Sequence, residues 1–324
     1  MEVIIIKSDF VKVIKREIFS LLDKNLKRII KQVAKHKLAK LTEIRLRANK
    51  PLILEFINDE MIIDCSANPI TDIRQAYLVK QQEIKNTLNL MAKGSFYTLE
   101  DEFKSGYLTL QGGHRVGMVG EVVKKDGKIA RIKNIAALNI RISREIIGAA
   151  NGVIRKVIKG KNDIYNTLII SSPACGKTTL LRDLARQISN GSDKLNFKGL
   201  KVGVVDERSE IAGAYKGVSQ NRLGIRTDLI DRCPKAEGMM LLIRAMSPEV
   251  LITDEIGSKA DFAAIKEALN AGVRIVTTMH ASNLAEARTR AGFEKILDSN
   301  IFSRIIILSR KKGPGTIEKI IKRG

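Results

Sequence analysis

The sequence is poor in the residues that mark several common protein classes. Its 324 residues include no tryptophan, and aromatic residues make up only 4% of the chain. That scarcity argues against a surface on which nucleic-acid bases stack. Three cysteines are present, Cys65, Cys175 and Cys233, far apart in the chain. They lack the paired spacing of a zinc site, and their odd number indicates reduced thiols in a cytosolic setting.

Long apolar runs are also missing. No stretch approaches the roughly 18 consecutive apolar residues that a membrane-spanning helix requires. Charges interrupt the apolar patch after Met1, and no small-residue cleavage site follows it, so we expect no signal peptide. With 44% hydrophobic and 28% charged residues, the chain has the composition of a globular protein, and it is long enough for two domains.

Acidic residues are few relative to basic ones. The chain has 57 lysines and arginines against 35 aspartates and glutamates, a formal net charge of +22. Such a field favours polyanions, which include nucleic acid, an anionic lipid surface and nucleotide phosphates. The lysines are nevertheless spread through nearly every segment, as on an ordinary solvated surface. The charge alone therefore does not choose among these partners.

The first part of the chain mixes helical and strand patterns. Residues 11–36 carry apolar residues at helical spacing. Residues 43–56 alternate between apolar and polar side chains around Pro51 and predict two short strands. Residues 106–135 alternate in the same way, with a hairpin dipeptide at Asp126-Gly127. These patterns predict an α+β domain.

The second part of the chain alternates between strands and helices. Strands are expected at 167–171, 201–206, 249–254 and 273–279, and helices at 177–190, 237–246 and 259–271. Near-continuous apolar strands separated by helices predict a parallel sheet that is covered on both faces. A last pair of strands, 303–309 and 315–321, predicts an edge hairpin.

Residues 168–188, LIISSPACGKTTLLRDLARQI, join a buried strand to a helix through a short loop. The spacing approximates G-x-x-x-x-G-K-[ST], whose backbone N–H groups cradle phosphates, although Ser171 replaces the first glycine. Serine adopts ordinary turn geometry, so we expect a working loop. Lys177 would contact the terminal phosphates and Thr178 a Mg²⁺ ion, next to the positive end of the helix dipole. The predicted nucleotide-binding residues are Ser172, Pro173, Ala174, Cys175, Gly176, Lys177, Thr178 and Thr179.

Acidic residues follow a hydrophobic strand in VLITDEIG, residues 250–257. We expect Asp254 to hold Mg²⁺ through water and Glu255 to orient and deprotonate the attacking water. A pair of acids on an exposed loop is the alternative. Together with the phosphate loop, this motif predicts a nucleoside triphosphatase more specifically than either motif does alone.

Two more strands end in residues suited to the same site. GVVDERSEI, residues 203–211, ends its strand in Asp206, Glu207 and Arg208. TTMHASN, residues 277–283, ends its strand in His280. At the carboxyl end of a central strand, His280 would sense the γ-phosphate. A purely structural histidine is the alternative.

Longer motifs resemble a known family. TLIISSPACGKTTLLRDLARQIS, VVDERSEIAG, GIRTDLIDRCPKAEGMMLLIRAMSPEVLITDEIG and IVTTMHASN are similar to the stage III sporulation protein AA family. EIRLRANKPL, GGHRVGMVGEV and ALNIRISREIIG resemble the N-terminal domain of the same family. That family supplies the ATPase of the channel between mother cell and forespore in endospore formers. It is more distantly similar to type II and type IV secretion and pilus-retraction ATPases.

The resemblance implies an α/β fold in which a RecA-like P-loop motor domain with a parallel sheet is preceded by a smaller α+β domain. We expect an N-terminal domain at 1–146, a linker at 147–163 and the motor domain at 164–324. By motif, Asp206 and Glu207 fall on the acidic box of the wider superfamily, Glu255 on its catalytic glutamate and His280 on its histidine box. Secretion ATPases usually have glycine where this chain has Asp254.

The resemblance also implies a homo-hexameric ring that binds ATP and Mg²⁺. A neighbour's arginine would then meet the γ-phosphate. The candidates for that arginine are Arg115, Arg141, Arg144, Arg226 and Arg244. Other implied partners are membrane-embedded channel proteins, with the protein in the mother-cell cytoplasm and bound to the membrane only peripherally. Nucleic acid is not expected as a partner. A nucleic-acid-dependent ATPase and a non-hydrolysing scaffold remain alternatives.

Overall fold

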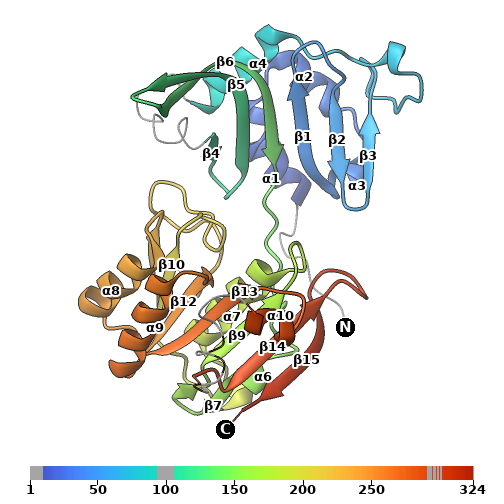
Figure 1. Cartoon of the computed structure of the whole chain (residues 1–324). Coiled ribbons are helices and arrows are strands. Elements are labelled where there is room, and N and C mark those ends of the chain that lie inside the picture. Colours follow the sequence, from blue (N-terminus) through green and yellow to red (C-terminus); the bar gives the residue numbers. More distant parts are fainter. Residues whose placement is uncertain are drawn as a thin grey trace. The chain divides into compact units, whose positions relative to one another are not determined.

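The structure is a computed structural model that describes residues 10–92, 106–289, 294, 297, 299 and 301–323. The described residues form two compact units, 10–144 and 145–323 (Figure 1). We refer to them as the N-terminal unit and the P-loop unit. None of the helices in the described ranges combines the length and the apolar character that crossing a bilayer requires.

The N-terminal unit contains an antiparallel six-stranded sheet in the order β3-β2-β1-β6-β5-β4. Its strands are β1 (Leu41–Arg47), β2 (Ile53–Phe56), β3 (Asp59–Ile62), β4 (Tyr107–Thr109), β5 (Arg115–Lys125) and β6 (Lys128–Arg141). Its helices are α1 (Phe10–Glu17), η1 (Phe19–Leu21), α2 (Lys24–Ile30), α3 (Lys35–Leu38), η2 (Ile73–Gln75) and α4 (Gln81–Met91). Asp126 and Gly127 both have positive φ at the turn between β5 and β6, the backbone geometry that a tight hairpin requires.

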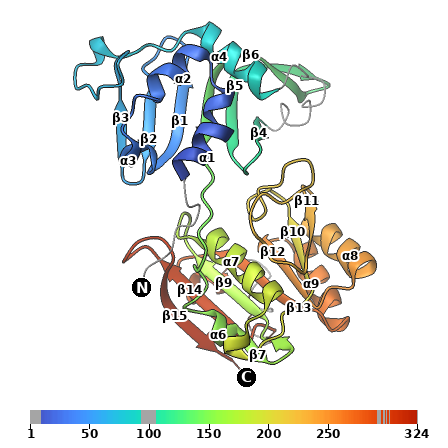
Figure 2. The ribbon, with the colours of Figure 1, turned by 180° about the vertical axis from the view of Figure 1, so that it is seen from behind.

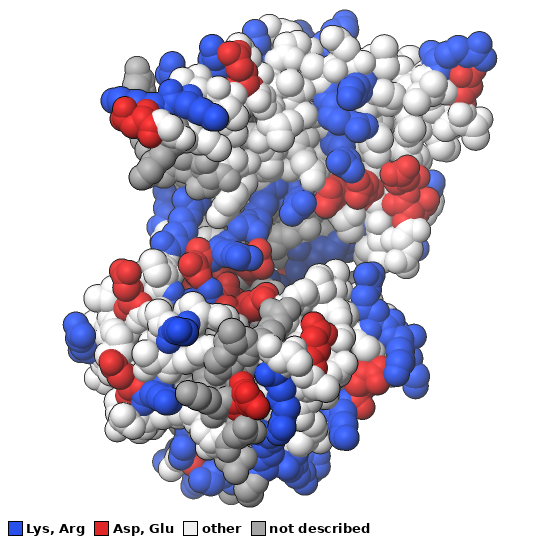
Figure 3. All heavy atoms as spheres, viewed as in Figure 1, with Lys and Arg blue, Asp and Glu red and all other residues white. Residues whose placement is uncertain are grey.

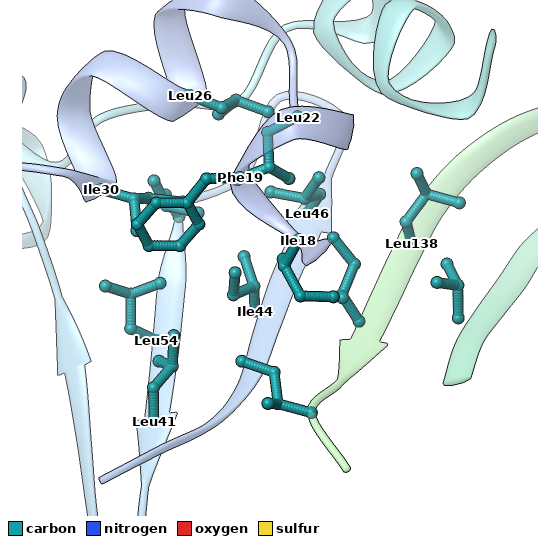
Figure 4. Packing of buried hydrophobic residues seen from close by; sticks show 14 of the residues in the cluster. Ile18, Phe19, Leu22, Leu26, Ile30, Leu41, Ile44, Leu46, Leu54 and Leu138 are labelled. Carbon is teal, nitrogen blue, oxygen red and sulfur yellow. The ribbon is translucent and has the colours of Figure 1, made fainter. Parts of the chain in front are cut away.

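The core of the N-terminal unit lies between these helices and one face of its sheet (Figure 4). Ile18 and Phe19 lie over Ile44 and Leu54 of the sheet, and all four side chains are fully buried. The helical pattern predicted over residues 11–36 is divided into several short helices. One division is fixed by Asp23, whose side chain accepts a hydrogen bond from the Asn25 N–H and caps α2.

The P-loop unit is built on a seven-stranded sheet in the order β11-β10-β12-β13-β9-β14-β15. Its strands are β9 (Thr167–Ser171), β10 (Val202–Asp206), β11 (Thr227–Asp231), β12 (Val250–Glu255), β13 (Arg274–His280), β14 (Arg304–Ser309) and β15 (Thr316–Lys322). Its main helices are α7 (Lys177–Asn190), α8 (Lys235–Met246), α9 (Lys259–Asn270) and α10 (Leu284–Thr289). All strands run parallel except the edge strand β15, which pairs antiparallel with β14.

Helices cover both faces of this sheet, as the near-continuous apolar strands predict (Figures 1 and 2). In β9, Ile169 belongs to the core under α7, whereas its neighbours Leu168 and Ile170 belong to the core under α8 and α9. The predicted α/β fold with a parallel sheet and a smaller preceding α+β domain is therefore confirmed.

Two features of the P-loop unit differ from the sequence-based expectations. Strand β11 was not predicted, because TDLID is short, half-buried and flanked by charges rather than continuously apolar. Residues 147–163, predicted as a linker, include α6 (Ile154–Val157), β7 (Ile158–Gly160) and β8 (Asp163–Ile164). Val153 and Val157 from this segment are fully buried in the core under α7, so the segment packs as part of the P-loop unit.

Candidate active site

The predicted motifs meet at one edge of the large sheet. β9, β12 and β13 are parallel neighbours, so their carboxyl ends lie side by side. Ser171 at the end of β9 pairs with His280 at the end of β13. Glu255 at the end of β12 pairs with Thr278. Ligands of open parallel sheets bind at such carboxyl ends.

The loop between β9 and α7 has the backbone conformation of a phosphate cradle. Ala174 and Gly176 both lie in the left-handed region, with φ of 55° and 88°. Gly176 is also the N-cap of α7, so the first-turn N–H groups of the helix open towards the loop with no intrahelical acceptors. Ser171 instead ends β9 as the last residue of an extended strand, and its hydroxyl donates to the Ser172 carbonyl at 2.9 Å. Position 171 therefore does not need the conformational freedom of glycine.

Lys177 folds back over this loop. Its Nζ donates to the Ser171 carbonyl at 2.8 Å and to the Ser172 carbonyl at 3.2 Å. The ammonium group is thus held at the loop by neutral oxygen atoms. Phosphate oxygens accept stronger, charge-assisted hydrogen bonds from such a group.

A cavity of about 500 Å³ lies at this edge of the sheet. The sequence-predicted residues that line it are Pro173, Ala174, Cys175, Gly176, Lys177, Thr178, Thr179, Asp254, Glu255 and His280. The cavity is also lined by Arg208, Glu210, Thr278 and Pro314. The phosphate loop, the acidic strand end and the histidine strand end therefore line one open cavity. Ser172 is the predicted loop residue that is not on its wall.

Asp254 is the most perturbed acid on the cavity wall. Its side chain is only 12% exposed, and this burial is the main reason that its pKa rises from 3.8 to about 6. The negative charges of Asp206 and Glu207 raise the pKa further, whereas Lys235 opposes the rise. Lys235 Nζ lies 3.2 Å from Asp254 Oδ1 and is also paired with Glu207.

The residues on the wall suit a divalent cation. Asp254 Oδ1 is buried, and its one close charged neighbour among the described residues is Lys235 Nζ at 3.2 Å, so the oxygen can still accept from a further ligand. Thr178 contributes a hydroxyl from the first turn of α7 to the same cavity. Carboxylate, hydroxyl and water oxygens are the ligands that Mg²⁺ takes beside phosphates. Asp254 and Thr178 therefore fit the predicted magnesium ligands. In the described part of the chain, no cluster of three or more His, Cys, Asp and Glu side chains forms a separate metal site.

Asp206 lies at the end of β10 but is not on the cavity wall. It is completely buried, and its carboxylate accepts the backbone N–H groups of Glu210 at 2.8 Å and Ala212 at 2.7 Å. Burial raises its pKa. Arg182 of α7 donates to the Glu210 and Ile211 carbonyls, each at 2.7 Å. Asp206 thus orders the loop that carries Arg208 and Glu210 to the cavity.

Glu207 lies in a second, neighbouring cavity of about 440 Å³. Asp254 and Glu255 line both cavities, and Lys235 lines the second one between Glu207 and Asp254. The acidic box of the sequence is therefore divided. Asp206 orders a loop, while Glu207 shares a lysine with the acidic strand end.

The predicted arginines lie away from the cavity of their own chain. Arg226 Nη1 donates to the Ser189 carbonyl at 2.9 Å, at the carboxyl end of α7, whereas the phosphate loop precedes its amino end. Arg244 is exposed in the last turn of α8 and lines neither cavity.

The other arginine candidates are engaged within the N-terminal unit. Arg144 Nη2 donates to the Ala39 and Leu41 carbonyls, and burial lowers its pKa to about 10. Arg115 stacks on the Tyr107 ring, 4.5 Å from the centroid. Arg141 lies 3.5 Å from Glu43 in an ion pair.

Some wall residues were not predicted from the sequence. Glu210 and Thr278 lie within the strand-end motifs GVVDERSEI and TTMHASN, so the signal for their position at the site is present in the sequence. Pro314 carries no such signal, because it lies in the turn between β14 and β15, far along the chain from the loop.

These observations define a RecA-like P-loop domain of α/β type with a smaller α+β domain before it. The chain belongs to the family described as "Sporulation stage III, protein AA", whose model matches residues 12–324.

Individual relatives agree with this assignment. The chain is 40% identical over 304 residues to the stage III sporulation protein AA of Bacillus subtilis, a match that covers 94% of each chain. Among solved structures, the pilus retraction motor PilT with bound ADP is similar at a TM-score of 0.55 and 13% identity, covering 90% of this chain and 77% of that chain. The ATPase DotB of Legionella pneumophila is similar at a TM-score of 0.51 and 17% identity, covering 82% and 72%. At these identities the structural likeness concerns the fold.

Proposed function

We propose that the chain is a Mg²⁺-dependent ATPase that works as a motor. The observation that carries this proposal is the single cavity that collects Lys177, Thr178, Asp254, Glu255 and His280 from three strand ends. The names of the structural neighbours, a retraction motor with bound ADP and an ATPase, favour the same activity.

Lys177 and the N–H groups of the α7 first turn bind the phosphates in this proposal. Lys177 exchanges two loop carbonyls for phosphate oxygens as the nucleotide enters. Thr178 and Asp254 hold Mg²⁺, which when bound offsets the negative charge of the phosphates.

Glu255 is the exposed acid of the strand-end pair and accepts the proton of the attacking water. His280, next to Ser171 in the sheet, contacts the γ-phosphate. Asp206 and Glu207 act indirectly, through the 206–212 loop and through Lys235.

The motor acts as a ring of identical subunits, six in our proposal. An arginine of the adjacent subunit stabilises the negative charge on the γ-phosphate. Arg244 suits that role better than Arg226 because its exposed side chain makes no hydrogen bond or ion pair within the described ranges, whereas Arg226 is already bound to the end of α7.

The cellular role follows from the family. We propose that hydrolysis drives a secretion-like channel between mother cell and forespore during sporulation. The ring would lie in the mother-cell cytoplasm and reach the membrane through membrane-embedded channel proteins.

A nucleic-acid-dependent motor is the rival proposal, and it rests on the net charge of +22. On the face shown in Figure 3, lysines and arginines are scattered and interspersed with acidic residues. Stimulation of turnover by DNA or RNA, with binding that weakens steeply in salt, would favour the rival.

The chemical proposal is tested by ATP turnover of the wild type and Glu255→Gln. We expect Glu255→Gln to lower turnover about 10²- to 10⁴-fold with nucleotide affinity retained, because only proton transfer is lost. Glu249→Gln is the matched control, since Glu249 lies at the amino end of the same strand and accepts the Lys201 N–H. Equal turnover in the wild type and Glu255→Gln would remove Glu255 from this role. Binding without turnover in the wild type would indicate a scaffold.

The ring is tested by mixing inactive variants. If Arg244 acts across a subunit boundary, a mixture of Glu255→Gln and Arg244→Ala chains forms some sites with both residues intact. We expect turnover in the mixture to exceed that of either variant alone, and wild-type turnover per chain to rise steeply with protein concentration. Constant turnover per chain with no complementation would argue against a shared site.

A further inference from the structure

The turn between β14 and β15 rests on the phosphate loop. The Gly315 N–H donates to the Cys175 carbonyl at 2.9 Å. A Cβ atom added to Gly176 would lie 3.1 Å from the Gly315 nitrogen. The backbone of the phosphate loop and the backbone of the turn are therefore in direct contact at this point. Pro314, next to this contact, lines the cavity.

The turn is ordered by its own hydrogen bonds. The Thr316 hydroxyl donates to the Gly313 carbonyl at 2.7 Å and accepts the Lys312 N–H at 3.2 Å. Lys311 pairs with Glu318 of β15 at 3.0 Å. Pro314 is therefore held at the cavity by a defined turn rather than by a chance approach.

The sheet order indicates which part of a nucleotide this turn faces. β9 has β13 on one side, followed by β12, and β14 on the other side. The two acids and His280 all lie on the β13 side, where the terminal phosphate reacts. A nucleotide with its γ-phosphate on that side extends past the loop towards β14.

We infer that the turn at residues 312–315 forms the wall that receives the nucleoside part of the nucleotide, with Pro314 packing against the base or ribose. This inference rests on the proposed function and adds a residue that positions the substrate. The ligand class is a nucleoside triphosphate recognised on this side by apolar contact.

The chemistry of the wall also predicts weak base selectivity. Pro314 has no side-chain donor or acceptor, and no Asn, Gln or aromatic side chain is among the described residues that line the cavity. A proline ring makes similar apolar contacts with adenine and with guanine, so it adds similar affinity for both. We therefore expect ATP and GTP to bind with affinities within about tenfold of each other, well short of the discrimination of a hydrogen-bonded base pocket.

The test compares ATP, GTP and inorganic tripolyphosphate on the wild type, Pro314→Ala and Pro314→Leu, all with Mg²⁺. We expect Pro314→Ala to weaken ATP and GTP about fivefold to tenfold, the loss for roughly 50 Å² of apolar contact, and to leave tripolyphosphate unchanged. Pro314→Leu keeps an apolar surface and should retain most of the nucleotide affinity.

Each other result overturns the inference in a distinguishable way. Equal weakening of nucleotides and tripolyphosphate by Pro314→Ala would mean that the turn only supports the loop. Equal affinity of the wild type for ATP and tripolyphosphate would mean that no nucleoside wall exists, with the proposed function intact. Binding of neither ligand would overturn the proposed function itself.

Photolabelling of the wild type with 8-azido-ATP provides a second measurement that needs no variant. We expect the label on a peptide that contains residues 312–315. Labelling confined to other segments would contradict the inference.

Discussion

Ser171 and His280 are register partners at the carboxyl ends of neighbouring parallel strands. This pairing places the start of the phosphate loop directly beside the histidine strand end, although more than a hundred residues separate them in the chain. Because side chains alternate between faces along a strand, a register shift of one residue would move His280 away from the cavity. The site therefore depends on the pairing of β9 and β13 as much as on the loop itself.

Lys235 opposes the rise in the Asp254 pKa that burial causes. Replacing it in Lys235→Met removes the cation that opposes the rise of the Asp254 pKa, so that pKa should move above its wild-type value of about 6. Divalent-cation binding requires the carboxylate, so affinity for Mg²⁺ with nucleotide falls as the pH drops through the pKa. We expect the acid limb of the pH–turnover profile to move to higher pH in the variant.

A charge-conserving variant provides the control. Lys235→Arg keeps a cation near Asp254 and Glu207, so its acid limb should stay within about half a pH unit of the wild type. Superimposable profiles for Lys235→Met and the wild type would contradict the assigned role of Lys235.

Ala174 has a left-handed backbone conformation, which glycine adopts at a lower energy cost than alanine. Its φ of 55° places a Cβ atom in the left-handed region. Ala174→Gly should raise the free energy of unfolding by about 0.5–1 kcal/mol, since relief of strain exceeds the entropy added to the unfolded chain. Ala174→Val should lower it by about 1 kcal/mol or more because a β-branched side chain tolerates this region poorly. Urea unfolding curves measure both, and a destabilised Ala174→Gly would show that the positive φ is not a constraint.

Arg226 stabilises the carboxyl end of α7 through the Ser189 carbonyl. Arg226→Gln should lower the free energy of unfolding by about 0.5–1 kcal/mol, as expected for a lost cation at a helix end. Turnover per folded chain should stay within about twofold of the wild type, a barrier change of roughly 0.4 kcal/mol. Arg155→Gln, at an exposed position in α6, is a control that should change neither. A large loss of turnover with unchanged stability would instead assign Arg226 to the reaction.

Much of the site follows from local sequence patterns. The loop at 171–178 places phosphate-binding residues after a buried strand, and Asp254-Glu255 places two carboxylates at the end of another. Parallel pairing of the two strands in one sheet brings their carboxyl ends to the same edge. The cavity confirms that residues 173–178 of the loop lie close to Asp254 and Glu255. Their catalytic roles stay predictions.

The remaining features depend on contacts that no local pattern encodes. Asp206 resembles a site acid by position, yet its carboxylate accepts backbone N–H groups of its own loop. Lys235 joins Glu207 to Asp254 only because α8 begins beside both strands. Pro314 reaches the loop because β14 pairs with β9, and the order of strands in a sheet is set by tertiary contacts rather than by local sequence.

Above all, we propose that the cavity binds nucleotide phosphates through Lys177. The most direct measurement is a calorimetric titration of the wild type and Lys177→Ala with Mg²⁺ and ADP, with exposed Lys201→Ala as the control for loss of charge. We predict that Lys177→Ala binds about 10- to 150-fold more weakly, as expected for loss of a charge-assisted contact, while Lys201→Ala binds like the wild type. Equal affinity of the wild type and a folded Lys177→Ala would contradict the claim.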